Sequence, residues 1–305
     1  MTTLRQLRFL VALDKTLSFS RASELCHVTQ STLSTGLKEL ENGLGVQVAE
    51  RTKHRVLMTP VGRDLAERAR GILAGVQDLE ERARRESTAR ATALRLGTIP
   101  TVGPFLMPRA MPLLRAALPD TKLYLREELT DPLIKGLMEG RLDLILIALP
   151  HPLPAQIETE ILFSDGYWLA TPTDHPLGNR SRIRSDDLAD RKLLLLERGH
   201  CLQRHALSSF PDITLDEDPS FAATSLSTLV AMVEEEIGIT LLPKLAIDAG
   251  ISKGHALHMG ALDGARPRQI ALGWRQSSPH GQLFSQLGAC LTAARSDLVE
   301  SAATM

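Results

Sequence analysis

The sequence predicts an α/β fold with a helical, winged N-terminal part and a longer part in which strands and helices alternate. Two observations support this prediction. Over about the first 90 residues, apolar positions recur at the three- and four-residue spacing of amphipathic helices. From about residue 92 onward, short apolar runs typical of buried strands alternate with helical stretches.

Length and composition exclude several classes of protein. A chain of 305 residues with 43% hydrophobic positions is long enough for about two domains, each with its own core. Three cysteines are too few for a disulfide scaffold, and neither CxxC nor HExxH spacing occurs. The chain has no apolar run of ~20 residues and no signal peptide at its start. We therefore expect a cytoplasmic protein without a membrane partner, a metal or a cofactor.

The net charge of −1 conceals an asymmetry. Residues 1–90 hold 15 Lys and Arg against 11 Asp and Glu, a net charge of +4, so the remaining 20 basic and 25 acidic residues give −5. A basic N-terminal part joined to an acidic remainder favours a nucleic-acid partner for residues 1–90.

The first 45 residues predict three short helices. The second is expected over residues 20–26, with Ser18 or Ser20 as its N-cap, and the third over residues 31–45, after a turn at 27–29. The apolar stripe of the first helix comprises Leu4, Leu7, Leu10, Val11 and Leu13, and that of the third comprises Leu33, Leu37, Leu40 and Leu44. This is the arrangement of a helix-turn-helix that reads double-stranded DNA.

Two surfaces are expected to contact that DNA. The polar leading end and outer face of the third helix carry Gln30, Ser31, Thr32, Ser34, Thr35 and Lys38. Residues 50–60 predict a hairpin wing with the basic residues Arg51, Lys53 and Arg55. We expect Gln30, Thr32 and Ser34 to lie near base edges in the major groove, and the wing to contact phosphates.

Pro60 opens a long helix. Its apolar positions follow a heptad-like seam over about three heptads: Val61, Leu65, Ala69, Ile72, Val76, Leu79 and Ala83. The seam predicts dimerisation through this helix; the alternative is a helix packed on its own domain.

Strand runs over 93–100, 121–129 and 142–150 alternate with helical stretches at about 103–118 and 130–140. This β-α-β-α-β order predicts a sheet with helices on both faces. Further strands are expected at 166–172, 192–197, 220–224, 239–243 and 268–274, and helices at 225–236 and 281–296.

The chain resembles LysR-type transcriptional regulators in residues 19–52, in the wing that ends at Thr59-Pro60, and in GITLLP at 238–243. The family commonly has proline where Ser31 stands, and serine is tolerated in a first turn. The resemblance implies a winged helix-turn-helix (1–60), a dimerising linker helix (61–90) and a two-lobed effector domain like a periplasmic binding protein (91–305). Lobe 1 would cover about 91–163 and 268–305, and lobe 2 about 164–267. A homodimer or homotetramer and contact with RNA polymerase are also implied.

Within the family, the chain is most similar to the OxyR peroxide-sensor subgroup. Four segments match in order: 97–108, 197–207, 221–233 and 238–243, of which the Gly199-His200-Cys201 triplet is the specific part. The resemblance implies that Cys201 senses hydrogen peroxide in a pocket with Thr101, Thr130, His200 and Arg268. The two threonines could instead cap the helices that follow them, and Arg268 could form a surface ion pair.

Cys201 also stands out without the resemblance. It precedes a helical stretch, and the positive end of a helix dipole favours a thiolate, which peroxide oxidises to sulfenic acid. The alternative is a small buried apolar residue, as most free cysteines are.

The chain departs from the subgroup at the second cysteine, whose thiol resolves the sulfenic acid of the first cysteine into a disulfide. Where OxyR-like sensors usually have a second cysteine, this chain has Phe210. Cys26 and Cys290 are both expected to pack in helices. The residues therefore leave open how an oxidised Cys201 is resolved.

The resulting hypothesis is a DNA-binding regulator that responds to hydrogen peroxide through Cys201. The alternative is a regulator of the same family whose inter-lobe cleft binds a small metabolite. We do not expect an enzyme, because His200 is adjacent to Cys201 and adjacent side chains rarely form a nucleophile–base pair.

Overall fold

The computed structural model describes residues 2–51, 56–87, 92–178, 180, 182–188, 192–197, 199–202, 205 and 216–303. It divides into two compact units. The first comprises Met1–Ala89 with Met138–Arg141 and Ser277–Pro279, and the second comprises Arg90–Leu137, Leu142–Gln276 and His280–Met305. Across the described ranges, no helix is both long and apolar enough to span a membrane.

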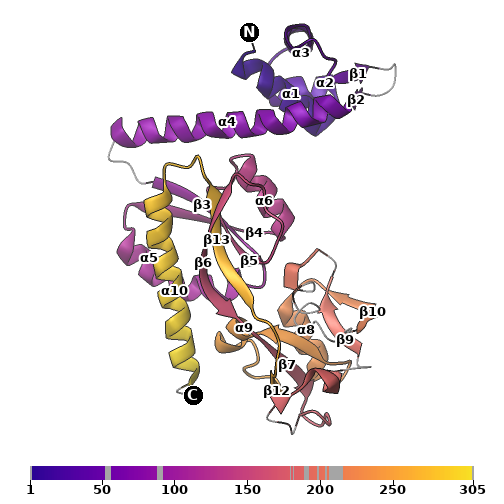
Figure 1. Ribbon diagram of the computed structural model, residues 1–305, viewed down its shortest axis with the longest axis vertical. Coiled ribbons are helices and arrows are strands. Elements are labelled where there is room, and N and C mark those ends of the chain that lie inside the picture. Colours follow the sequence, from indigo (N-terminus) through magenta and orange to yellow (C-terminus); the bar gives the residue numbers. More distant parts are fainter. Residues whose placement is uncertain are drawn as a thin grey trace. The chain divides into compact units, whose positions relative to one another are not determined.

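The first unit contains the three predicted short helices, a hairpin and a long helix (Figure 1). In chain order these are α1 (Leu4–Thr16), α2 (Phe19–Leu25), α3 (Gln30–Leu44), β1 (Ala49–Arg51), β2 (Val56–Met58) and α4 (Pro60–Ser87). Thr3, Ser18 and Thr29 each accept a backbone hydrogen bond at a helix N-terminus. Ser18 is therefore the N-cap of α2.

The core of this unit differs in detail from the predicted stripes. Leu4 and Leu44 were expected to be buried, and both are exposed at the ends of their helices. Phe9, which lies outside the predicted stripe, is buried and packs where Gly36 leaves room on α3. A short helix end extends past the core, so spacing alone overestimates burial there.

Five strands form the larger sheet of the second unit, in the order β4-β3-β5-β13-β6 (Figure 1). They are β3 (Thr92–Thr98), β4 (Thr121–Glu127), β5 (Leu144–Leu149), β6 (Ile157–Asp165) and β13 (Arg268–Arg275). β3 is parallel to β4 and β5, whereas β13 is antiparallel to β5 and β6. The connecting helices are α5 (Gly103–Ala117) and α6 (Thr130–Met138), and α10 (Gly281–Ala303) packs beside α5. This agrees with the predicted β-α-β-α-β order.

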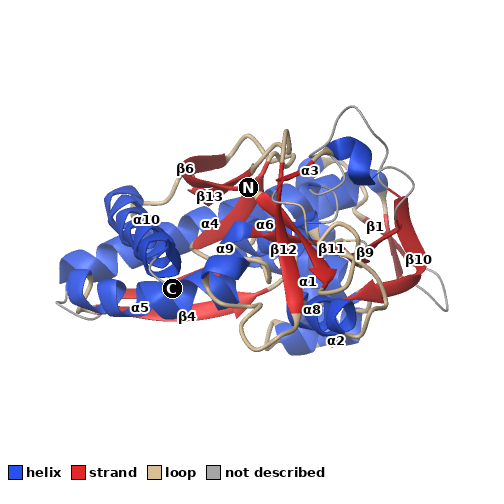
Figure 2. Cartoon of the chain, turned by 90° about the horizontal axis from the view of Figure 1, so that it is seen from below, coloured by secondary structure: helices blue, strands red, loops and turns tan. Residues whose placement is uncertain are grey.

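The chain then forms a second lobe with its own sheets. A four-stranded sheet has the order β11-β7-β12-β8, and β10 pairs with β9. The strands are β7 (Tyr167–Pro172), β8 (Arg182–Ile183), β9 (Lys192–Leu196), β10 (Asp216–Ala223), β11 (Thr240–Pro243) and β12 (Leu257–Leu262). The helices are η1 (Ser185–Leu188), α8 (Leu226–Glu234) and α9 (Lys244–Asp248). Figure 2 shows α8 beside β11, and α10 beside α5 and β6.

The chain passes between the lobes twice. β6 ends at Asp165 and β7 begins at Tyr167; β12 ends at Leu262 and β13 begins at Arg268. The two crossings are adjacent, because Asp165 and Arg268 are direct partners in the β6–β13 ladder. The predicted two-lobed architecture is thus confirmed. The strands β6 and β12 were missed, since neither has a continuous apolar run.

Candidate functional site

Cys201 lies in a sharp turn after strand β9. Gly199 has a φ of +112°, a conformation that favours glycine, and a Cβ there would approach Leu129 to 3.2 Å. The turn leads directly into Cys201 and Leu202, which have helical backbone, as does His205. The other residues of the expected helix lie outside the described ranges. Cys201 is 6% exposed, so its thiol is enclosed by the protein.

Both lobes contribute to the pocket around this thiol. It is lined by Ile99, Pro100, Thr101, Leu129, Thr130, His200 and Cys201. Three of these residues follow β3, two lie where α6 begins, and two belong to the turn after β9. The space between the side chains is narrower than a water molecule. A ligand therefore requires the side chains to move apart, and the smallest ligands require the least movement.

The two pocket threonines do not cap helices. Val102 is the N-cap of α5 and makes no side-chain capping bond, and the hydroxyl of Thr101 accepts a hydrogen bond from Arg268 Nη1 at 2.8 Å. The hydroxyl of Thr130 is buried and has no hydrogen-bond partner in the described part of the chain. An unpaired buried hydroxyl is unfavourable by about 1–3 kcal/mol. Thr130 thus offers an unused donor and acceptor beside Cys201.

Arg268 is 1% exposed and forms a buried ion pair, so the alternative of a surface ion pair is wrong. Its Nη2 and Nε donate to Asp165 Oδ2 at 2.8 and 3.1 Å, and Nη2 also donates to the Thr101 carbonyl at 3.2 Å. Burial alone lowers the pKa of Arg268, but the charges of Asp165, Tyr167 and Cys201 raise it above its ordinary value. Arg268 is therefore a permanent cation that interacts electrostatically with Cys201.

The histidine of the triplet is buried next to the thiol. Burial lowers the pKa of His200 below its ordinary value, against a smaller opposing effect of Glu197. At neutral pH the ring is therefore uncharged. His200 therefore adds no positive charge beside Cys201. The positive charge that acts on the thiol is that of Arg268.

Sequence reasoning missed two residues of this site, Asp165 and Tyr167. Asp165 is fully buried and holds Arg268. The hydroxyl of Tyr167 is buried with no hydrogen-bond partner among the described residues, and burial raises its pKa well above the ordinary value. Neither residue belongs to a local motif. Asp165 lies 103 positions before Arg268, and only the β6–β13 register brings them together.

The other two thiols are separate from this pocket. Cys26 is half-buried against the core of the first unit, and Cys290 is half-buried on α10. Burial raises the pKa of both thiols, with Arg8 opposing it for Cys26, so both disfavour the reactive thiolate. All three cysteines are free. Phe210 lies outside the described residues.

The predicted DNA-contacting residues fall into two groups. Those of the third helix lie in the first turns of α3: Gln30, Ser31, Thr35 and Lys38 are exposed, and Thr32 and Ser34 are half-buried. The Thr29 hydroxyl accepts from the Thr32 backbone N–H at 3.2 Å and fixes this end of the helix. Arg51 ends strand β1, whereas Lys53 and Arg55 lie outside the described residues.

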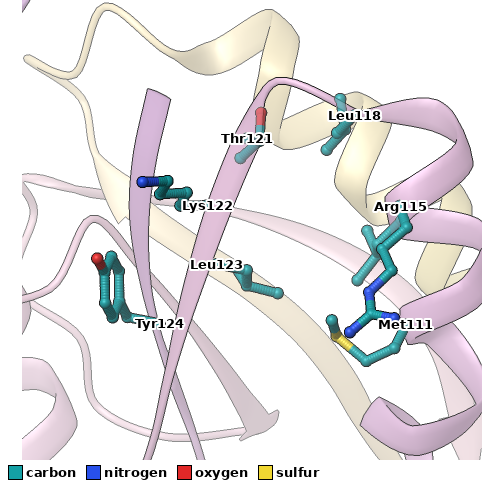
Figure 3. A pocket seen from close by; sticks show the side chains of 8 residues that line it. Met111, Arg115, Leu118, Thr121, Lys122, Leu123 and Tyr124 are labelled. Carbon is teal, nitrogen blue, oxygen red and sulfur yellow. The ribbon is translucent and has the colours of Figure 1, made fainter. Parts of the chain in front are cut away.

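A larger hollow of about 340 Å³ lies elsewhere in lobe 1, between α5 and β4 (Figure 3). Its lining includes Met111, Arg115, Leu123 and Tyr124. None of the predicted site residues lies in it. The hollow is open and lined by side chains of mixed polarity, and it brings together no group suited to peroxide chemistry.

Comparison with known proteins identifies the class to which this fold and site belong. Residues 4–63 match the family model of the bacterial regulatory helix-turn-helix proteins, lysR family, and residues 87–296 match the LysR substrate binding domain. The chain belongs to the LysR family of transcription regulators.

Several similar members of that family are OxyR proteins or hydrogen peroxide-inducible genes activators. It is 41% identical to the hydrogen peroxide-inducible genes activator of Dickeya chrysanthemi, over 93% of each chain. It is 39% identical to the DNA-binding transcriptional dual regulator OxyR of Escherichia coli K12, over 95% of each chain. A full-length OxyR variant from Pseudomonas aeruginosa superposes with a TM-score of 0.73 at 35% identity, over 95% of each chain. The predicted similarity to the OxyR subgroup is thus confirmed.

Proposed function

We propose that this protein is a cytoplasmic, DNA-binding transcriptional regulator that responds to hydrogen peroxide through oxidation of Cys201. One observation carries the proposal. The Cys201 thiol shares a buried pocket with Thr101 and with the Thr130 hydroxyl, which has no partner in the described part of the chain. The relatives named for hydrogen peroxide-inducible genes support the same function.

The chemistry follows from the polar groups around the thiol. The Cys201 thiolate attacks one peroxide oxygen; an S–O bond forms as the O–O bond breaks, giving sulfenic acid and hydroxide, which leaves the pocket and is protonated to water by the buffer. Thr101 and Thr130 hold the peroxide, and Arg268 stabilises the negative charge on the thiolate and on the leaving oxygen. Each oxidation is a signal, and the protein is not an enzyme in this scheme.

The other parts of the chain supply the response. We assign DNA binding to residues 1–60, dimerisation to residues 61–90 and sensing to the two-lobed remainder. Gln30, Thr32 and Ser34 contact base edges, whereas the basic wing contacts phosphates. Assembly to a dimer or tetramer presents paired α3 helices to successive major grooves, and the bound assembly contacts RNA polymerase.

The rival function is a small-metabolite regulator of the same family. The narrowness of the pocket favours peroxide, because a metabolite of several heavy atoms requires larger movements of the lining side chains. The two functions also differ in what they require of Cys201. Peroxide sensing requires its thiol, whereas metabolite binding does not.

The deciding experiment treats the full chain briefly with peroxide, then measures the mass of each cysteine-containing peptide and the footprint on operator DNA. We expect oxygen or thiol addition at Cys201 and a changed footprint. Cys201→Ser should fold, bind DNA and lose the response, and Cys26→Ser and Cys290→Ser should keep it. A normal response in Cys201→Ser would refute peroxide sensing and favour a metabolite.

A further inference from the structure

The buried ion pair between Asp165 and Arg268 is one hydrogen bond away from the sensing pocket. Arg268 Nη1 donates to the hydroxyl of Thr101, and Thr101 lines the pocket together with Cys201. The opposite side of the guanidinium is held by Asp165, through two hydrogen bonds to one carboxylate oxygen. Both residues are almost fully buried, so water screens their charges little.

The charges around Cys201 can be counted group by group. On β13 the facing group is the Arg268 cation, and on β6 it is the Asp165 anion. On β7, Tyr167 keeps its proton because burial raises its pKa, and next to the thiol His200 is neutral because burial lowers its pKa. Glu197 is exposed to solvent. The Arg268 charge is therefore largely cancelled by Asp165 before the thiol ionises.

We propose that Asp165 sets how readily Cys201 ionises, and through it the peroxide concentration at which the protein responds. Asp165 acts through Arg268 and is a positioning residue. The claim about ionisation stands on this geometry alone, whereas the claim about peroxide rests on the proposed function. By neutralising Arg268, the carboxylate keeps the resting thiol less reactive than an unpaired guanidinium would make it.

The geometry also predicts what happens when this carboxylate is neutralised. Arg268 would keep its two bonds to Thr101, to the hydroxyl and to the carbonyl oxygen, so it would stay beside the pocket. Asp165 Oδ1 separately accepts from the Leu245 N–H at 2.8 Å, where α9 begins, and an asparagine amide can keep one of these two acceptor roles. Asp165→Asn should therefore leave an uncompensated cation near Cys201.

The test is a pH titration of the full chain carrying Cys26→Ser and Cys290→Ser, so that Cys201 is the only thiol. Thiolate formation is followed by its ultraviolet absorbance. We expect Asp165→Asn to lower the titration midpoint by about one pH unit or more. At pH values below both midpoints, a midpoint that is lower by about one pH unit should speed peroxide oxidation about tenfold, because the thiolate fraction rises about tenfold.

Two further variants distinguish an effect of the Asp165 charge on Cys201 from a general loss of native structure. Asp143 is a matched control: it is buried, accepts from Arg95 Nη2 at 2.7 Å, from Arg95 Nε at 3.0 Å and from the Arg95 backbone at 2.7 Å, and does not line the pocket. Asp143→Asn should leave the Cys201 midpoint unchanged. Asp165→Glu restores the carboxylate and should return the midpoint toward that of the parent chain.

The same substitution is repeated in an Arg268→Gln background, where Asp165→Asn leaves no buried cation unpaired. Because Asp165 acts through Arg268, the midpoint should change much less there than in the parent chain. An unchanged or higher midpoint in Asp165→Asn, or an equal fall in the Arg268→Gln background, overturns the proposal. Failure of peroxide to oxidise Cys201 in the parent chain would instead refute the proposed function and leave the titration result standing.

Discussion

At the scale of single residues, the site combines groups that satisfy each other with groups that do not. Thr101, Arg268 and Asp165 form a continuous hydrogen-bonded set, whereas the hydroxyls of Thr130 and Tyr167 have no partner within the described ranges. Buried polar groups in folded proteins are nearly always paired, so an exception needs an explanation. For Thr130, the proposed function supplies one: the hydroxyl would bind peroxide during its reduction.

This explanation gives a prediction for Thr130→Val, which removes the hydroxyl and keeps the shape. Because the hydroxyl is unpaired, the midpoint of thermal unfolding should stay the same or rise. The second-order rate constant for Cys201 oxidation should fall by about five- to tenfold, because the transition state loses one hydrogen bond that contributes ~1 kcal/mol or slightly more. Stopped-flow oxidation and thermal unfolding measure the two quantities.

The matched control is Thr171→Val, since the Thr171 hydroxyl on β7 is also buried without a partner in the part of the chain that the structure describes. It does not line the pocket. It should show the same effect on stability and none on the rate. If both variants oxidised at the parent rate, Thr130 would have no role in holding peroxide.

A second prediction at this scale concerns the product of oxidation. With phenylalanine at position 210, oxidised Cys201 has no thiol at that position with which to form a disulfide. It should stop at sulfenic acid, be capped by a small thiol such as glutathione, or overoxidise. Intact-mass measurement should show added oxygen or added thiol, and Phe210→Cys alone should convert this to a loss of two hydrogens. A Cys201–Cys290 or Cys201–Cys26 linked peptide in the parent chain would contradict the prediction.

The residues of the site were not equally predictable from sequence. Cys201, His200 and Gly199 form a contiguous triplet, and the positive φ of Gly199 explains why glycine stands there. Thr101 and Thr130 follow predicted strands, so a local pattern locates them. Asp165 carries no local signal, because its role depends on the pairing of two antiparallel strands 103 residues apart. Long-range register is the information that a single sequence does not provide.

At the scale of elements, periodicity predicted most helices and the buried strands. It failed for β6 and β12, whose burial alternates incompletely along the strand. It also placed the end of the last helix too early, since α10 continues to Ala303. These failures have one physical cause: an exposed or half-exposed segment lacks the apolar run that identifies a buried one.

The long helix α4 carries a prediction about assembly. Along the predicted seam, Val61, Ile72 and Leu79 are 40%, 52% and 69% exposed in the single chain, whereas Ala69 packs into the core of its own unit. The seam is thus divided between an inward and an outward face. The outward apolar side chains favour a second copy of the chain as their partner.

Ile72→Lys should weaken self-association by at least about tenfold, because each copy would lose the burial of a large apolar side chain. Sedimentation of the full chain over a range of concentrations measures this. Glu67→Lys, on an exposed position of α4 outside the seam, is the control for added charge and should assemble like the parent chain. Equal association of both variants would show that the seam is not an interface.

At the scale of the whole molecule, the chain joins a basic DNA-reading part to an acidic sensing part, and its function requires the two to be energetically coupled. Coupling between two binding equilibria is reciprocal. If capping of Cys201 by glutathione changes the affinity for operator DNA by some factor, operator DNA must change the equilibrium constant for capping by the same factor. This holds whatever the structural route between the sites.

The prediction is therefore a closed cycle of four measurements on the full chain. The operator dissociation constant is measured for the reduced and the glutathione-capped protein. The capping equilibrium is then measured in glutathione redox buffers, with and without saturating operator. The two ratios should agree, and both should differ from one by about fivefold or more, the usual range of allosteric coupling. A DNA duplex of unrelated sequence controls for non-specific charge effects, which depend on salt and should influence capping far less. Ratios near one would mean that the state of Cys201 is not communicated to the DNA-binding part, and the peroxide response would then require an additional component.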